Sequence, residues 1–431
     1  MDWILLIGVV ITFALFLTGS PIFVALGIGS AFLTQFAFGM PPHTCAHMVV
    51  QGISSFTMLA LPLFVYMGEI FLEGGAAKAL FDVMKVTFGR IPGGLGIATV
   101  VAAGFFAAIC GSAAASIATI GIIMIPQMLE ENYDEGFAGS VVSVSGTLGN
   151  IIPPSMFFII YGALVEQNVA TLFAAGMLPG ILTVGIMVVC AYIIGKRKGY
   201  ILSAEISPHE RRDIIKRSVP ALIMPVIVLG SIYAGIATPT EAASVACVYS
   251  LIIGVFFYRG LNWQTFWNAT KRAANTIGSV MIMVAGGILL GRMFVLAEFP
   301  QKILNLVMTA SLSPLAFLLL ASIVIIILGT FMECILMLFV CVPLFYASVM
   351  ALGISPIHFG VVLVVGIMVG QNTPPMAESI FIASAVGNIP AAAITKSILP
   401  FVLCIALVFY LTIFFPELSL IIPRSLGLVL P

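Results

Sequence analysis

GNIIPPSM, at residues 149–156, interrupts a long apolar segment with two consecutive prolines. Pro153 and Pro154 remove two backbone donors, and a proline inside a helix costs about 3 kcal/mol or more. In lipid, where no water repairs the freed backbone groups, a broken helix is tolerated only where protein or a water-filled cavity surrounds it. The motif therefore predicts an interrupted helix inside a packed or water-lined site.

The rest of the chain has the composition of a membrane protein. Of its 431 residues, 61% are hydrophobic and 8% are charged, whereas an ordinary soluble domain has roughly 25% charged residues. The N-terminus lacks the basic region of a cleavable signal, so we interpret it as a retained first helix. The zero net charge does not indicate nucleic-acid binding. The scattered cysteines favour buried thiols over a disulfide framework.

Long apolar runs predict about ten full membrane spans. Two further segments, 92–128 and 314–350, are broken in the middle by GSAAAS (111–116) and GTFMEC (329–334). Each is either two crossings or one re-entrant hairpin, and the positions of the charged loops agree with both readings. With the N-terminus outside, 14 Lys and Arg residues face the cytoplasm and two face out, as the positive-inside rule requires. The predicted full spans lie near 3–19, 21–38, 53–72, 137–165, 171–195, 218–235, 239–258, 275–297, 357–387 and 394–415.

The chain divides into two similar halves. A polar linker, 196–217, separates a first repeat (1–195) from a second repeat (218–415), and a C-terminal tail (416–431) follows. Moving the first repeat by 221 positions places its Gly-x-x-x-Pro-Pro motif on that of the second. Each half has five full spans, so the second repeat is expected to be inverted. Inverted repeats with interrupted segments at corresponding positions indicate the binding site of a secondary transporter.

The residues around each double proline suggest a cation site beside an anion site. The segments 149–152 and 370–373 are expected to be unwound, which frees carbonyl and side-chain oxygens that suit sodium. Pro153 and Pro374 are predicted to begin new half-helices. The N-termini of such half-helices carry partial positive charge and favour an anionic substrate.

Together these motifs resemble the large membrane subunit of TRAP transporters, the DctM type. The resemblance covers essentially the whole length and rests on ICGSAAASIATIG (109–121), GTLGNIIPPSMFFIIYG (146–162), GIATPTEAASV (235–245), GTFMEC (329–334) and GQNTPPMAES (370–379). It implies an all-α polytopic membrane protein with re-entrant hairpins at 92–128 and 314–350 and broken helices at 137–165 and 357–387. It also implies an elevator mechanism and sodium-driven uptake of an organic acid across the bacterial inner membrane.

The resemblance also implies partners and an orientation. A small DctQ-type membrane subunit is expected as a separate polypeptide, because this chain begins directly with the large subunit. A periplasmic DctP-type binding protein would deliver the carboxylate. The N-terminus is expected to be periplasmic. Sodium serves as the coupling ion, and no other cofactor and no transition metal is expected.

Carried over residue by residue, the resemblance implies two sodium sites with the substrate between them. Glu378 is a candidate substrate ligand, proton carrier or structural partner, since ionisable residues inside the membrane are functional candidates. Arg292 either pairs with the substrate carboxylate or extends toward the interface. The first sodium site would use Gly111, Ser112, Ser116, Gly149 and Asn150; the second would use Gly329, Thr330, Gly370, Gln371, Asn372 and Thr373; the substrate would lie near Pro154, Ser155, Pro375 and Met376.

Other functions fit the sequence less well. The motifs of an intramembrane protease are absent from the sequence, so we do not expect an enzyme. A channel needs a continuous polar lining, whereas the polar residues here gather at two related breaks. The remaining alternative is a sodium-coupled carboxylate transporter of a related elevator fold that works without a binding protein.

Overall fold

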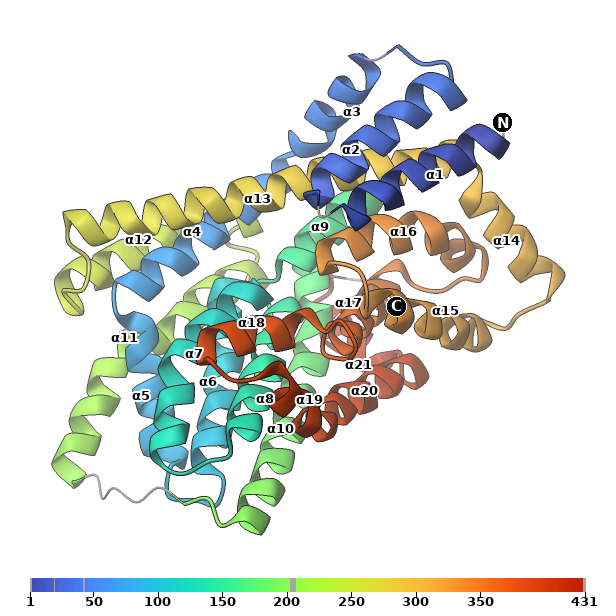
Figure 1. Ribbon diagram of the computed structural model, residues 1–431. Helices are drawn as coiled ribbons and strands as arrows, with labels where there is room; N and C mark the ends of the chain where they lie inside the picture. Colours follow the sequence, from blue (N-terminus) through green and yellow to red (C-terminus); the bar gives the residue numbers. More distant parts are fainter. Residues whose placement is uncertain (1, 19, 42, 202–206, 429–431) are drawn as a thin grey trace.

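The computed structural model describes residues 2–18, 20–41, 43–201 and 207–428, and these residues form helices and no strands (Figure 1). In lipid the backbone polar groups must be paired within the chain, which a helix does by itself. Seven of the described helices are long and apolar enough to cross a membrane, or eight if α19 and α20, bent by 54°, form one span. The predicted all-α polytopic fold is confirmed.

The first repeat contains the helices up to α10. Five residues of the predicted linker, 202–206, and the last three of the predicted tail, 429–431, lie outside the described residues. The helices are α1 (Asp2–Leu17), α2 (Ile22–Phe32), η1 (Leu33–Ala37), α3 (His43–Ile53), η2 (Phe56–Leu59), α4 (Ala60–Glu73), α5 (Ala76–Phe88), α6 (Gly94–Cys110), α7 (Ala113–Glu130), α8 (Glu135–Gly146), η3 (Thr147–Asn150), α9 (Met156–Val165) and α10 (Val169–Lys198).

The predicted second repeat, 218–415, begins within α11, whose residues 208–217 belong to the predicted linker, and the last helix lies in the predicted tail. This last helix, α21, packs on α10. The helices are α11 (Pro208–Tyr233), α12 (Pro239–Ile252), η4 (Ile253–Phe257), α13 (Trp263–Leu296), α14 (Phe299–Thr309), α15 (Pro314–Gly329), α16 (Cys334–Ala351), α17 (Pro356–Gln371), α18 (Glu378–Gly387), α19 (Ala391–Ser397), α20 (Leu399–Phe414) and α21 (Glu417–Ser425).

Both segments with central breaks fold as helix pairs. In the first pair, α6 ends at Gly111, whose positive φ of +64° turns the chain into α7. A left-handed backbone is accessible to glycine at little cost, so GSAAAS provides a tight tip. In the second pair, Thr330–Met332 separate α15 from Glu333, the N-cap of α16. The helices therefore break where the sequence predicts.

The two double-proline helices are also broken, but the new half-helices begin later than expected. The first break joins α8 and η3 to α9, which starts at Met156 with Ser155 as its N-cap. The second joins α17 to α18, which starts at Glu378. Pro153 and Pro374 thus lie within the links and are not the first helical residues. A side-chain cap fixes the start of α9, because Ser155 Oγ accepts the Phe157 N–H at 3.2 Å.

The second half of each broken helix packs against the other repeat. From the first repeat, α9 contacts α16 and α17, and the Tyr161 hydroxyl donates to the Pro356 carbonyl at 2.7 Å. From the second repeat, α18 lies beside α7 and α8 (Figure 1). This exchange brings the two breaks together at the centre of the molecule.

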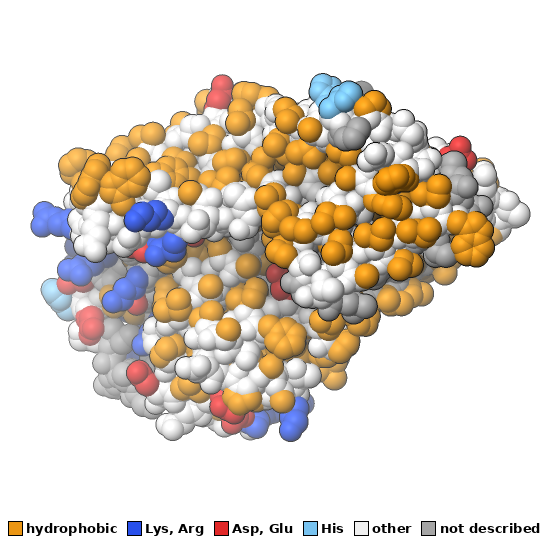
Figure 2. All heavy atoms as spheres, turned by 45° about the horizontal axis from the view of Figure 1, so that its top comes forward, with side chains coloured by type: hydrophobic (Ala, Val, Ile, Leu, Met, Phe, Trp, Pro, Cys, Tyr) orange, Lys and Arg blue, Asp and Glu red, His pale blue; other side chains and the backbone are white. Residues whose placement is uncertain are grey.

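One helix is much longer than a membrane is thick. The 34 residues of α13 extend about 50 Å at 1.5 Å per residue, against a hydrocarbon core of about 30 Å. The predicted span 275–297 is the C-terminal part of this rod. Near its N-terminal end, Arg272 forms ion pairs with Glu69 and Glu73 of α4. On the face shown in Figure 2, hydrophobic side chains cover most of the surface and Lys and Arg gather toward one end.

Candidate functional site

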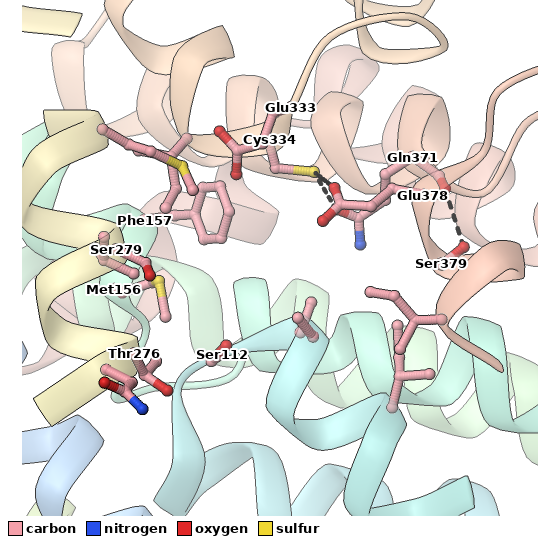
Figure 3. Close-up of a pocket in the computed structure, with 18 residues that line it drawn as sticks. Ser112, Met156, Phe157, Thr276, Ser279, Glu333, Cys334, Gln371, Glu378 and Ser379 are labelled. Carbon is pink, nitrogen blue, oxygen red and sulfur yellow. Dashed lines mark hydrogen bonds between the residues drawn. The ribbon is translucent and has the colours of Figure 1, made fainter. Parts of the chain in front are cut away.

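A cavity of about 340 Å³ lies where the two helix-pair tips, the two breaks and α13 meet (Figure 3). Because α7, α9, α16 and α18 all begin at this cavity, four helix N-termini with partial positive charge surround it. Its lining is Ser112, Ala113, Ala114, Ile117, Met156, Phe157, Asn275, Thr276, Ser279, Val280, Met283, Glu333, Cys334, Ile335, Gln371, Glu378, Ser379 and Ile382.

The tip of the first helix pair is held against the first break. The Met156 N–H donates to the Gly111 carbonyl at 3.3 Å, and the Ser155 hydroxyl donates to the Asn150 carbonyl. Gly149 lies so close to the tip that a Cβ on it would be 3.2 Å from the Ser112 carbonyl carbon and 3.4 Å from Ser116 Oγ. The predicted residues of the first sodium site therefore lie together in the structure.

Two of these residues have buried oxygens without a hydrogen-bond donor. Asn150 is fully buried, and its Nδ2 donates to Gln371 Oε1 at 3.1 Å. Within the described part of the chain, however, Asn150 Oδ1 accepts nothing. Ser116 Oγ also accepts no hydrogen bond there, and its hydroxyl is directed at the Cys110 thiol. A buried polar atom without a partner costs about 1–3 kcal/mol, so these oxygens suit an ion.

At the second break, the polar side chains already form hydrogen bonds with other groups of the protein. Asn372 Nδ2 donates to Thr147 Oγ1 at 3.1 Å and to the Met368 carbonyl at 2.8 Å, and Asn372 Oδ1 accepts the Ser379 hydroxyl at 2.8 Å. Thr330 and Thr373 each donate to a backbone carbonyl of their own helix. Gly370 touches Gly329 of the second tip. The predicted second sodium site is assembled, but its side chains are already paired.

The cavity contains two carboxyl groups and, among its lining residues, no Lys, Arg or His. Glu333 caps α16 by accepting the Leu336 N–H at 3.0 Å. Glu378 Oε2 lies 3.4 Å from the Cys334 thiol, which also contacts Gln371. The predicted residue Glu378 is therefore at the cavity, and Glu333 joins it.

Several predicted substrate residues lie elsewhere. Arg292 is on α13 but does not line the cavity. It follows Met283, the last lining residue of this helix, by nine residues, which places it about 13 Å farther along the helix axis. Pro375 and Met376 are exposed outside the lining. Pro154 and Ser155 are buried behind it, where the Pro154 carbonyl touches Gly111. The residues at the cavity are instead those just after each link.

The residues that α13 contributes to the cavity were not predicted from the sequence. Asn275, Thr276 and Ser279 line the cavity, and their side chains make no hydrogen bond among the described residues. Figure 3 shows Thr276 and Ser279 there. Their i, i+1, i+4 spacing places them on one face of a helix, a signal that was present within the predicted span 275–297. In the part of the chain that the structure describes, no three His, Cys, Asp or Glu side chains could hold a metal ion.

Interrupted helices and paired tips that meet around a cavity with polar side chains in its lining are the features of a secondary membrane transporter. The chain belongs to the family of the tripartite ATP-independent periplasmic transporter, DctM component, whose model matches residues 9–418. This agrees with the resemblance in the motifs. Members of this family are transporters and not enzymes.

Two characterised relatives show how far the similarity extends. The sialic acid TRAP transporter large permease protein of Vibrio cholerae is 34% identical over 379 residues, 88% of this chain and 89% of the relative. The isethionate TRAP transporter permease protein of Oleidesulfovibrio alaskensis is 33% identical over 412 residues, 95% of this chain. This chain spans only 65% of the length of the isethionate permease.

A solved structure has a similar fold. The YdaH transporter of Alcanivorax borkumensis matches with a TM-score of 0.62 over 85% of this chain and 86% of the other, at 12% sequence identity. At this identity the likeness concerns the fold alone.

Proposed function

We propose that the chain drives sodium-coupled uptake of an organic acid across the bacterial inner membrane by an elevator movement. In this proposal a DctP-type periplasmic binding protein delivers the acid, and a separate DctQ-type small subunit accompanies the chain. The N-terminus faces the periplasm. The observation that carries the proposal is the pair of buried oxygens, Asn150 Oδ1 and Ser116 Oγ, that accept no hydrogen bond among the described residues and lie beside a central cavity.

The first break fits a sodium ion in its donor set. Asn150 Oδ1, Ser116 Oγ and the nearby Ser112 carbonyl are hard oxygens, and backbone carbonyls at unwound helices coordinate sodium in secondary transporters. The Asn150 amide is oriented by its bond to Gln371, which directs the amide nitrogen away from the ion. An ion bound here would connect the first tip to both breaks.

The cavity supports the assignment of an acid as the substrate. Ala113 and Ala114, at the start of α7, line it, and their backbone N–H groups make no hydrogen bond in the described part of the chain. Free N–H groups at a helix N-terminus form an anion-binding site. Since α13 supplies one wall and the broken helices supply the others, movement of the broken helices along α13 would carry the substrate across the membrane.

Sodium-dependent uptake into proteoliposomes, with the binding protein and small subunit present, tests the proposal. We expect Asn150→Ala and Ser116→Ala to raise the sodium concentration for half-maximal uptake about tenfold, the effect of one lost ligand contact. Ser30→Ala is the matched control, because Ser30 Oγ is also buried without a partner but lies on α2. Unchanged sodium activation in both variants would remove the ion from this site.

Omitting the binding protein from the same vesicles separates the proposal from the alternative of a transporter that works alone. We expect uptake to stop without it. Uptake that continues at the full rate would favour the alternative. Omitting the small subunit tests that partner in the same way.

A further inference from the structure

The two repeats place different residues at equivalent positions around the cavity. The offset of 221 relates Asn150 to Gln371, which are hydrogen-bonded to each other. It also relates Ser112, the N-cap of α7, to Glu333, the N-cap of α16. Likewise Phe157 corresponds to Glu378. At both positions the second repeat has a carboxyl group where the first has a neutral side chain.

The side of the cavity formed by the first tip is rich in hydrogen-bond donors. The Ala113 and Ala114 N–H groups are free, and the side chains of Asn275 and Thr276 of α13 make no hydrogen bond among the described residues. Ser112 lies on the same side (Figure 3). None of these groups has a negative charge, and the start of α7 contributes partial positive charge. An anionic group is stabilised here.

The side of the cavity opposite the first tip has carboxyl groups, which accept hydrogen bonds, in place of hydrogen-bond donors. Figure 3 shows Glu333, Cys334 and Glu378 across the cavity from Ser112. A carboxylate can accept about four hydrogen bonds. Glu333 uses one of these acceptor positions to cap α16, so the others are available to a ligand. No Lys, Arg or His lines the cavity to pair with either group. Two carboxyl groups without a protein cation are suited to a ligand that supplies the cation.

We propose that the substrate is a zwitterion, an organic acid that also has a positively charged group. Its acidic group binds at the start of α7 with Asn275 and Thr276, and its cationic group binds between Glu333 and Glu378. This inference rests on the proposed function, since it takes the cavity as the substrate site. It goes further by setting the charge pattern of the substrate.

The polarity of the cavity can be measured without knowing the substrate. Cys334 lies between the two carboxyl groups and is a free thiol. Full-length protein in lipid nanodiscs is treated with 2-aminoethyl methanethiosulfonate, which is cationic, or with its anionic 2-sulfonatoethyl analogue. Peptide mass spectrometry measures how fast each reagent modifies Cys334. Each modification rate is divided by the rate at which the same reagent modifies a small neutral thiol in solution, which corrects for the reactivity of the reagent itself.

We expect the cationic reagent to be favoured about tenfold at Cys334 and the preference to fall several-fold in Glu378→Gln. At the other end, Ser112→Cys in a Cys334→Ser background should prefer the anionic reagent. Glu166→Gln is the control, because Glu166 follows α9 and lines a different pocket. This variant should retain the full preference at Cys334.

The zwitterion proposal would be wrong if the two reagents reacted with Cys334 at equal rates or if the anionic reagent were preferred. It would also be wrong if Glu378→Gln left the ratio of the two rates unchanged. In those cases the cavity is still reached by solutes, so the proposed function stands. Failure of both reagents to reach Cys334 would overturn the inference and also count against the cavity as the substrate site. The Cys334 measurements decide the question even if the Ser112→Cys chain does not fold.

Discussion

The two breaks have related sequences but different surroundings. In the first, every residue from 147 to 155 is buried, and the link is bonded to the neighbouring tip. In the second, Pro374, Pro375 and Met376 are exposed, with Met376 58% accessible. The first break leaves an amide oxygen unpartnered, whereas the second pairs its asparagine fully. The offset of 221 thus preserves the interruption without preserving its chemistry.

In a symmetric site both breaks would bind the ion and contact the solute. The difference between the breaks assigns one of these roles to each. A buried link with an unpaired oxygen favours holding an ion. An exposed link beside two carboxyl groups favours contact with solutes that enter and leave. The comparison can be broken or sharpened by substituting residues in the two breaks.

The largest difference is expected at the paired glycines. A Cβ on Gly370 would lie 2.6 Å from Gly329 Cα and 2.8 Å from its carbonyl carbon. Because neither backbone atom can rotate away, Gly370→Ala should lower the free energy of unfolding by about 3 kcal/mol. Gly149→Ala, whose nearest contact would be 3.2 Å, should lower it by about 1 kcal/mol. Thermal unfolding in detergent measures both, and equal effects would contradict the difference in packing.

A smaller difference is expected at the asparagines. Asn372→Ala removes three hydrogen bonds and leaves the Thr147 and Ser379 hydroxyls with fewer partners, so we expect a loss of about 2 kcal/mol. Asn150→Ala removes one bond together with an unpaired oxygen, and we expect about 1 kcal/mol or less without sodium. Unfolding in choline chloride separates this effect from ion binding. A larger loss for Asn150→Ala would reverse the comparison.

The matched pair Ser155 and Met376 tests the links themselves. Ser155 is buried, caps α9 and donates to the Asn150 carbonyl. Removing an N-cap side chain costs about 1 kcal/mol, so Ser155→Ala should show that loss. Met376→Ala should stay within about 0.5 kcal/mol, as for other exposed positions. Urea titrations of both variants would disprove the contrast if the two midpoints move together.

The smallest effect is expected outside both breaks, in the loop before α8. Hydrogen bonds with the Tyr200 hydroxyl and with Lys198 hold the pKa of Asp134 below its ordinary range. A lowered pKa means that the stabilisation is complete above the unfolded-state value and is lost as the pH falls below about 4. Both side chains of the ion pair are more than half exposed, so Asp134→Asn should cost about 0.5 kcal/mol at pH 7. Unfolding temperatures from pH 7 to 3 should converge for the two proteins.

The sequence predicted where helices break better than how the breaks are chemically completed. Consecutive prolines cannot remain in a helix, so both interruptions could be located from sequence alone. The start of α9 was placed too early: the Ser155 cap is a local bond that the sequence could have indicated, whereas the bond from Met156 to Gly111 is a tertiary contact. The equivalence of Ser112 and Glu333 was missed because the second tip has three additional residues, Thr330–Met332, which shift the register.

The contribution of α13 was missed for a different reason. A span with a few polar residues resembles any other span until its neighbours are known. Asn275, Thr276 and Ser279 gain meaning only because the tip of α6 and α7 faces them across a cavity. For Arg292 the error is the opposite one. As a charged residue within a predicted span it was a candidate substrate ligand, but its position along α13 is remote from the cavity.

The exchange of half-helices between the repeats has a consequence for biosynthesis. The contacts of α9 include α16 and α17, and those of α7 and α8 include α18, so neither half of the chain provides all of its partners. When the ribosome has made the first repeat, the place that α18 takes beside α7 and α8 is still empty, and it stays empty until Gly387, the last residue of α18, has been translated. The central site is therefore completed only at the end of synthesis, and a truncated chain would enter the membrane without it.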